Sequence, residues 1–365
     1  MKEFINSIRI FLIYRTYKFM VIFERFANKG FALDIFSKKF QKDPYQTYSK
    51  MRSINPIYHS KPTFLRWVTK MQLVQQILRD ERFSVDDRKY PIAKLRRKEL
   101  KRDGRDIMLD QFENPSILKL DPPDHSRIRK LVSYGFSNRY IKSLENHIIE
   151  TIDQCLDHTH NLDSFDLMEV LAKPLPAIVI AKMMGLPDKD LNQFQMWSEN
   201  LLQEVGGIGS SVKKRKLARD AYEDLIRYFE KIILSRKDNP GEDFIGKLIK
   251  AEEEGDKLNV KEMYGTCLLL LIAGHETTTR LIGNGLYSLL NHPDQYEMIK
   301  KDYSLIPNAI EEMLRFEPPV HATVRFAYAD MEYEGNSYKK GTPFAISIAG
   351  CLLYTSDAAD ETVSV

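Results

Sequence analysis

A long stretch of helical spacing constrains the fold of this chain more than any other feature. Between Asp121 and the Asn291-His292-Pro293 stop, apolar residues recur every three or four positions through five segments, as they do along one face of an α-helix. The segments are 127–136, 142–155, 166–185, 217–235 and 260–290. The sequence therefore predicts a mainly α protein.

Shorter segments outside this region predict small β-sheets. Ile57-Tyr58 and Phe64 to Val68 are typical of short strands, and a helix is expected from Leu73 to Arg82. Near the end, Met331 to Tyr338 and Pro343 to Ala349 alternate or run apolar around two glycines. No internal repeat or low-complexity linker marks a boundary, so we expect one domain over residues 1–350.

Charge and cysteine content exclude several classes of protein. The 365 residues carry 54 basic and 51 acidic side chains, a net charge of +3, so the basic excess that nucleic-acid binding needs is absent. The three cysteines, Cys155, Cys267 and Cys351, have no paired or CxxC spacing, which argues against a disulfide scaffold and a zinc site. This composition predicts a cytoplasmic protein.

The N-terminal segment Ile8 to Phe23 is apolar and aromatic, but Arg9, Arg15 and Lys18 interrupt it. A membrane-spanning helix needs about 20 mostly apolar residues, so no stable membrane anchor is expected. We expect a basic amphipathic helix that packs on the protein, and contact with a membrane interface is the alternative.

The segment Cys267 to Thr279 (CLLLLIAGHETTT) predicts an unusual buried helix. Its apolar run is followed at once by Gly274 and three threonines, residue types that lower helix propensity. Glu276 shares the buried register, where loss of hydration would favour its neutral acid. A threonine hydroxyl that bonds the carbonyl one turn back would bend or widen the helix. These residues indicate a groove for a small polar ligand and its protons, while a kinked core helix explains them equally well.

Three further groups have little meaning alone. Glu312 and Arg315 lie three apart on one helix face, a spacing that usually marks an ordinary surface pair. His125 and Arg129 follow a helix start and share a face, where they would bind a carboxylate or simply form an exposed basic face. Arg325, in a strand-like stretch, is a third candidate donor.

The order of these groups resembles the soluble bacterial cytochrome P-450 family, the haem-thiolate monooxygenases. The resemblance runs from about Phe40 to Gly350, and five segments in the family's order carry it. They are DPPDHSRIRKLVSYGF (121–136), LAKPLPAIVIAKMMGLP (171–187), LLLIAGHETTT (269–279), EEMLR (311–315) and EPPVHATVR (317–325).

The resemblance implies the cytochrome P-450 fold and roles for particular residues. His125 and Arg129 match donors to one haem propionate, and Arg325 matches the donor to the other. Glu312 and Arg315 match the pair that locks the core beneath the haem, a structural role.

In the central helix, Ala273 and Gly274 match the family's oxygen-binding groove. Glu276 and Thr277 match the acid–alcohol pair that feeds protons to bound dioxygen. Three further regions match those that line or cover the substrate pocket: the loop from Phe83 to Asp121, the segment from Asn200 to Leu217, and residues 320–324.

The resemblance also implies cofactors and partners. The family uses haem b and O2 to oxidise an apolar small molecule with electrons from NAD(P)H. Because no Rossmann or flavin fingerprint occurs here, the electrons would come from a separate ferredoxin or flavodoxin. The basic runs at 94–105 and 213–216 are candidate docking surfaces or solvated faces.

The family pattern breaks after Gly350, so we expect an incomplete fold without the haem-ligand loop, last helix and terminal sheet. The Phe- and Gly-rich loop with the thiolate cysteine is absent, and no metal ligand is therefore named. Cys351, directly after a strand, is a poor substitute. Residues 351–361 resemble a translated sequencing adapter, so 351–365 is expected to be a non-native tail. Because the thiolate ligand is missing, the chain itself is expected to be inactive.

Two alternatives remain at this stage. A member of the same fold could use peroxide, isomerise or merely bind a ligand, although the acid–alcohol pair favours O2 activation. The second alternative is an α-helical protein without haem that binds a carboxylate lipid through its basic residues. Such a protein would purify colourless.

Overall fold

The computed structural model of the protein describes residues 2–102, 105–202, 212–253 and 255–353. Its contacts gather in two compact units. Unit 1 comprises residues 1–90 with 288–365, and unit 2 comprises residues 91–287. A single domain over 1–350 therefore stays a prediction.

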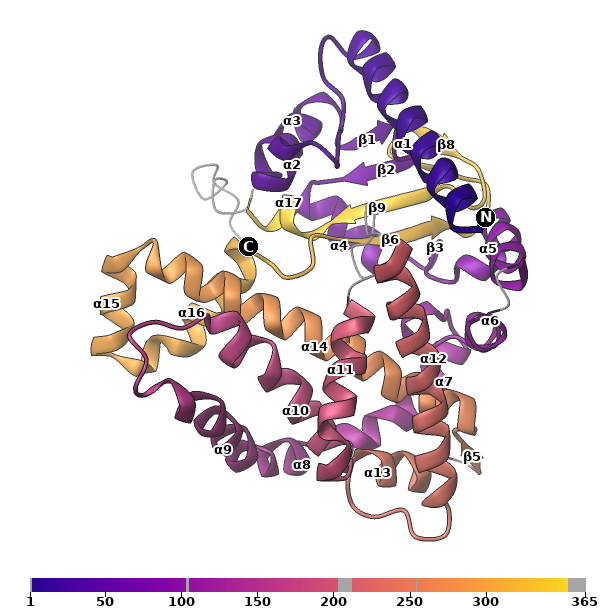
Figure 1. The fold of residues 1–365 in the computed structure, drawn as a ribbon. Helices are drawn as coiled ribbons and strands as arrows, with labels where there is room; N and C mark the ends of the chain where they lie inside the picture. The colour runs from indigo at the N-terminus through magenta and orange to yellow at the C-terminus, as the bar shows by residue number, and fades with distance from the viewer. Residues whose placement is uncertain (1, 103–104, 203–211, 254, 354–365) are drawn as a thin grey trace. The chain divides into compact units, whose positions relative to one another are not determined.

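Unit 1 contains a five-stranded sheet with the order β1-β2-β9-β6-β3 (Figure 1). Strands β2 and β9 run parallel, and the other neighbours are antiparallel. The central strand β9 is buried at four of its five positions, as its apolar sequence PFAIS predicts. The strands are β1 Ile57–Ser60, β2 Leu65–Val68, β3 Phe83–Ser84, β6 Ala322–Ala327 and β9 Pro343–Ser347, and β7 Met331–Tyr333 pairs with β8 Asn336–Tyr338 in a separate hairpin.

Helices accompany this sheet within unit 1. Two apolar clusters form its core, one around Val68, Phe344 and Ile346 and the other around Tyr48 and Trp67. The helices are α1 Lys2–Ala27, α2 Lys38–Lys42, α3 Tyr45–Ile54, α4 Met71–Arg79, α15 Pro293–Lys301, α16 Ile306–Phe316 and α17 Ile348–Leu352.

Unit 2 is almost wholly helical, apart from the short pair β4 Glu252–Glu253 and β5 Asp256–Lys257. One large apolar cluster, with Phe194, Phe229 and Phe244 fully buried, forms its core. The helices are α5 Pro91–Arg102, α6 Asp106–Glu113, α7 Asp124–Ser133, α8 Asn138–Ser143, α9 Glu145–Leu156, a π-helical turn Met168–Ala172, α10 Pro174–Met183, α11 Leu191–Leu202, α12 Val212–Ser235, α13 Phe244–Lys250 and α14 Val260–Leu290, which ends in unit 1.

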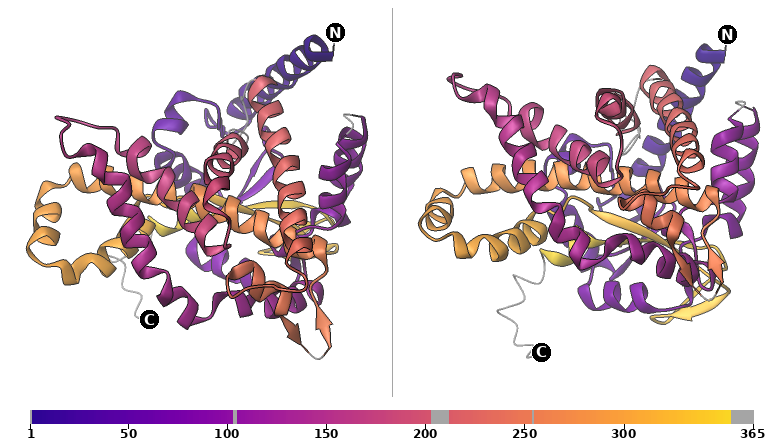
Figure 2. Two further views of the ribbon diagram at one scale, coloured as in Figure 1. Left: turned by 60° about the horizontal axis from the view of Figure 1, so that its bottom comes forward. Right: turned by 90° about the horizontal axis from the view of Figure 1, so that it is seen from below.

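The predicted fold class, mainly α with small β-sheets, is confirmed. The helix expected over 260–290 has these bounds in the structure, and Figure 2 shows it as one long continuous helix. The charge run at 94–105 lies largely in α5, and that at 213–216 lies in the first turns of α12.

Some boundaries were wrong. The helix expected to reach Arg82 ends at Arg79. The strand expected to reach Ala349 ends at Ser347, whose hydroxyl accepts the Gly350 amide at 3.2 Å and caps α17. Cys351 therefore lies in a short helix and not directly after a strand. Of the expected tail 351–365, residues 354–365 lie outside the described residues, as do 203–211 of the expected substrate region.

The N-terminal helix packs on unit 1 as expected, with Tyr17, Val21 and Glu24 buried. A search of the described residues finds no helix that is both long and apolar enough to cross a bilayer.

Candidate functional site

Three of the predicted site residues share one face of α14. At about 100° of rotation per residue, Ala273, Glu276 and Thr277 point to the same side of the helix, and Arg280 lies one turn beyond. Ala273 and Arg280 are exposed, and Glu276 and Thr277 are half-buried. The structure thus brings these residues together on an open strip of a helix that is otherwise largely packed.

Glu276 does not lie in the buried register of α14 that the sequence predicted. Its side chain is 15% exposed, and its carboxylate accepts a hydrogen bond from the Arg280 guanidinium in an i,i+4 ion pair. The error has a geometric cause, since the buried register of Leu268, Leu271 and His275 lies roughly a quarter-turn away.

The hydroxyl of Thr277 bonds the carbonyl one turn back, as expected, but the helix is not opened there. Thr277 Oγ1 donates to the Ala273 carbonyl at 2.5 Å, which leaves its lone pairs available to accept from a neighbour. The predicted local opening is absent in the described residues of α14, which remain α-helical throughout. The carbonyl of Ala273 accepts the hydroxyl without breaking the helix.

Gly274 has a packing role that the sequence did not indicate. A Cβ at this position would lie 2.9 Å from Cδ1 of Ile180 in α10, closer than side chains normally approach. Glycine therefore allows α14 and α10 to pack closely here.

His275 ties three helical segments together, and the sequence analysis missed it. The ring is buried, with Nδ1 against the Ser198 hydroxyl of α11 and Nε2 3.0 Å from the Lys173 carbonyl next to α10. A carbonyl only accepts, so Nε2 carries the proton and Nδ1 accepts from Ser198. Burial lowers the pKa of His275, so the neutral ring is favoured. The partners lie 77 and 102 residues away in sequence, which explains why no local pattern revealed them.

His125 and Arg129 project from one face of α7, as predicted. His125 is half-buried and Arg129 is exposed, and neither side chain has a hydrogen-bond or ion-pair partner within the described part of the chain. Arg127 points to the other side, where it pairs with Asp256 and Glu262. The face that carries His125 and Arg129 therefore offers two donors for an anionic group.

In unit 1, Glu312 and Arg315 form a bidentate pair on α16. Nε and Nη2 of Arg315 donate to the two carboxylate oxygens, each at 2.6 Å, which lowers the pKa of Glu312. Arg315 Nη1 also lies 3.5 Å from the Leu352 carbonyl in α17. The glutamate side chain is 52% exposed, so this pair lies at the margin of its unit.

Arg325 lies on β6, also in unit 1, and is half-buried. Its Nη1 donates to the Val324 carbonyl at 3.1 Å and lies 3.4 Å from Thr323 Oγ1. Local contacts therefore hold the guanidinium near its own strand.

None of the three cysteines has the environment of a thiolate ligand. Cys351 is 2% exposed, its thiol donates to the Ile348 carbonyl at 3.1 Å, and burial raises its pKa to about 11. Burial also raises the pKa values of Cys155 and Cys267. Within the described ranges, no cluster of three or more His, Cys, Asp or Glu side chains is arranged to hold a metal ion.

Comparison with known proteins identifies the family. The model of the family described as "Cytochrome P450" matches residues 85–353. The chain belongs to the cytochrome P450 family. It is therefore related to haem-containing, iron-binding oxidoreductases of the monooxygenase class.

Curated bacterial P450s are similar over most of the chain. The polyketide biosynthesis cytochrome P450 PksS of Bacillus subtilis is 33% identical over 318 residues, 85% of this chain and 76% of that protein. The biotin biosynthesis cytochrome P450 of the same organism is 34% identical, over 84% of this chain and 75% of that protein. The chain thus spans about three quarters of each relative.

Solved P450 structures have the same fold. The structure of B. subtilis PksS matches with a TM-score of 0.76 and 32% identity, over 88% of this chain and 78% of that one. P450BioI in complex with hexadec-9Z-enoic acid-ligated acyl carrier protein matches with a TM-score of 0.75 and 32% identity, over 87% and 79%.

The residues present fit a haem in part. His125 and Arg129 offer two donors without partners of their own, which suits a propionate. The strip of Ala273, Glu276 and Thr277 combines a small side chain with an acid and an alcohol. The cysteines do not fit the role of axial ligand, because their thiols are held protonated at neutral pH.

We expect Cys351→Ala to leave the absorption spectrum of the hemin-bound chain unchanged, because a buried thiol with a pKa of about 11 stays protonated at neutral pH. A hemin titration followed through the Soret region checks this, with Cys155→Ala as the matched control. A Soret shift produced by Cys351→Ala alone would show that this sulfur reaches the iron.

Proposed function

We propose that the parent protein of this chain is a haem-dependent monooxygenase that inserts one oxygen atom from O2 into an apolar small molecule. We also propose that this chain by itself is inactive, because none of its cysteines suits the axial position on the iron. The observation that carries the proposed reaction is the strip on α14, where Glu276 and Thr277 stand next to the small Ala273 on a helix whose other faces are largely packed. Family membership supplies the reaction class, and this strip supports oxygen chemistry over simple ligand binding.

In this proposal the bound haem supplies oxygen binding and O–O cleavage, and the chain supplies the contacts around it. His125 and Arg129 would bind one haem propionate, and Arg325 would bind the other. Charged donors make short, strong hydrogen bonds to carboxylates, so each of these residues suits a propionate.

Glu276 and Thr277 would transfer protons. The Thr277 hydroxyl donates to the Ala273 carbonyl, so its oxygen can accept a hydrogen bond from a water. The Glu276 carboxylate, paired with Arg280 and 15% exposed, is in reach of solvent. It would take up protons from water and deliver them along the strip toward Thr277.

Gly274 would help to position this strip of α14 by allowing close packing against α10. Because its missing side chain lets α14 approach Ile180, it fixes the depth at which the strip lies against α10. Glu312 and Arg315 would stabilise the core of unit 1 through their bidentate pair and the Leu352 carbonyl.

Electrons would come from NAD(P)H through a separate ferredoxin or flavodoxin in the cytoplasm. Basic side chains in α5 and at the start of α12 are exposed, among them Lys94, Lys98 and Lys213. Such a surface suits an acidic electron-transfer protein.

An apolar substrate agrees with the similar proteins. One is named for polyketide biosynthesis, and the structure of another holds a hexadecenoic acid attached to acyl carrier protein. The hexadecenoic acid is largely a hydrocarbon chain, and we propose a substrate of that chemical class for this protein.

We expect Arg129→Ala to weaken hemin binding by about tenfold, the equivalent of one lost charged hydrogen bond. Hemin titration of the purified chain gives the dissociation constant directly, without any need for turnover. Arg139→Ala is the matched control, since Arg139 is an exposed arginine on α8.

Three results would contradict the proposal in different ways. A chain that binds no hemin but binds long-chain carboxylates would be a lipid-binding protein. Equal affinities for Arg129→Ala and the wild-type chain would remove Arg129 from the haem contacts. A haem-loaded protein that turns over with hydrogen peroxide but not with O2 and reductant would use peroxide.

A further inference from the structure

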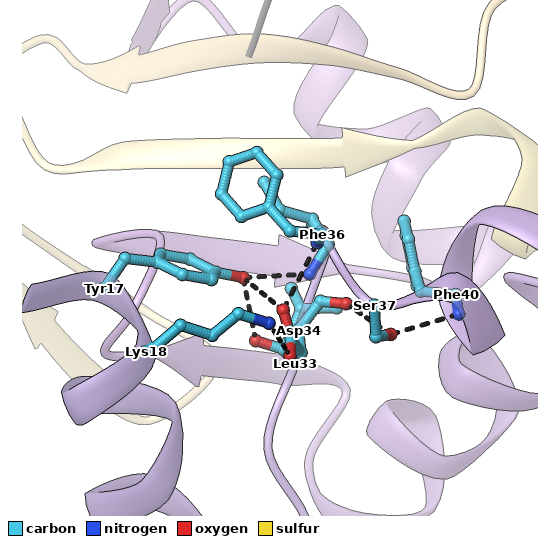
Figure 3. Close-up of polar contacts among 8 residues, drawn as sticks. Tyr17, Lys18, Leu33, Asp34, Phe36, Ser37 and Phe40 are labelled. Carbon is cyan, nitrogen blue, oxygen red and sulfur yellow. Dashed lines mark hydrogen bonds and ion pairs between the residues drawn. The ribbon is translucent and has the colours of Figure 1, made fainter. Parts of the chain in front are cut away.

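The helix α1 is fixed to unit 1 through polar contacts on one side. The Tyr17 hydroxyl accepts the Ile35 amide at 2.9 Å and lies 3.4 Å from Asp34 Oδ1, and Lys18 pairs with Asp34 at 2.7 Å. Figure 3 shows Tyr17 and Lys18 reaching from the helix toward the segment that follows it. These contacts define which side of α1 faces the protein.

Further along the helix, Glu24 lies on the same side as Tyr17. It is fully buried, accepts a hydrogen bond from the Tyr58 hydroxyl, and accepts the Lys61 amide at 2.7 Å. A buried carboxylate that lost these donors would be strongly destabilising. The helix therefore cannot roll about its axis to bury a different face in its own unit.

The opposite side of α1 is apolar and exposed. Phe19, Ile22, Phe23 and Phe26 have 69%, 52%, 55% and 85% of their surfaces accessible. At helical spacing they cluster about half a turn away from Tyr17, Val21 and Glu24. We call these four residues the outer face of α1. Large exposed apolar patches with a polar rim mark interaction sites.

The rim of the outer face is cationic. Arg15, Arg25 and Lys29 are exposed, and the Lys61 ammonium lies 4.8 Å from the centre of the Phe23 ring. Between residues 14 and 33 the sequence has one acid, Glu24, and it is buried on the inner side. The turn that carries Lys61 also exposes Phe64, at 63%.

We propose that the outer face of α1 docks onto an anionic phospholipid surface. Aromatic and aliphatic side chains enter the boundary between head groups and acyl chains, while the surrounding arginines and lysines pair with lipid phosphates. A second copy of this chain fits less well, because a two-fold interface would bring two cationic rims together. The contact is peripheral and reversible.

The test uses sedimentation of the whole chain with vesicles of equal parts phosphatidylcholine and phosphatidylglycerol, compared with pure phosphatidylcholine. We expect binding to the mixed vesicles that weakens as salt is raised. Phe19→Gln combined with Phe26→Gln should lower the partition coefficient by about tenfold or more, because two aromatic rings lose their apolar burial. The inner contacts of α1 are untouched by these changes.

Two matched variants separate the contributions. Tyr303→Gln with Leu290→Gln removes apolar residues that are 71% and 68% exposed elsewhere, and it should bind as the wild-type chain does. Arg15→Gln with Arg25→Gln should abolish the preference for phosphatidylglycerol. Equal binding to both kinds of vesicle by the wild-type chain would overturn the proposal. A dimer seen without vesicles and lost in the phenylalanine variant would assign the outer face to self-association instead.

Discussion

Replacing Glu276 with glutamine is expected to slow O2-dependent substrate oxidation by about 100-fold or more. Proton transfer from a positioned acid commonly contributes that much, and glutamine keeps the shape of the side chain while losing its transferable proton. The haem-loaded protein for this test carries residues 1–350 of this chain joined to the thiolate loop of a similar P450, because none of the cysteines of this chain suits the iron. The measurement is product formed per unit time with a surrogate ferredoxin system and a long-chain apolar substrate.

A matched control tests whether the effect is specific to Glu276. Glu145→Gln changes an exposed acid in the first turn of α9 and should leave the rate unchanged. A rate within about threefold of wild type, far below the typical contribution of a general acid, would remove Glu276 from the proton path.

Replacing His275 with alanine is expected to lower the free energy of unfolding by about 3 kcal/mol. The change leaves the Ser198 hydroxyl and the Lys173 carbonyl without their partner and opens a cavity among three packed segments. Urea denaturation of wild type and variant measures the difference. His147→Ala is the matched control, because that histidine lies on α9 with 57% of its side chain exposed.

The loss of unfolding free energy caused by His275→Ala should become smaller as the pH falls. Burial lowers the folded-state pKa of His275 below the ordinary 6.5, so below about 6.5 the unfolded chain binds a proton that the folded chain excludes. The neutral ring contributes fully above that pH, and its contribution falls as the solution is acidified toward the lowered pKa. The difference in unfolding free energy between wild type and His275→Ala should therefore decrease from about pH 8 to about pH 5. A constant difference would mean that His275 does not titrate in this range.

The sequence predicted regular elements well where a single periodic pattern persisted. The bounds of α14 agree because 31 residues of helical spacing leave little freedom. The family could be recognised because five moderate patterns occur in a fixed order, and order is far less probable by chance than any single motif.

Side-chain environments could not be predicted in the same way. Glu276 follows a buried apolar run in the sequence, yet helical rotation places it on the open strip beside Arg280. His275 looked unremarkable because its partners come from distant segments. Gly274 was read as part of a groove, and its contact with Ile180 became visible only once α10 was in place.

Three consecutive residues of α14 contact four different neighbours. Gly274 meets Ile180, His275 meets Ser198 and Lys173, and Glu276 meets Arg280. One residue inserted upstream would turn the helix by about 100° and carry the imidazole to the open position of Glu276. One residue deleted there would carry the carboxylate into the buried position of His275. The length of α14 upstream of His275 therefore has almost no freedom to change.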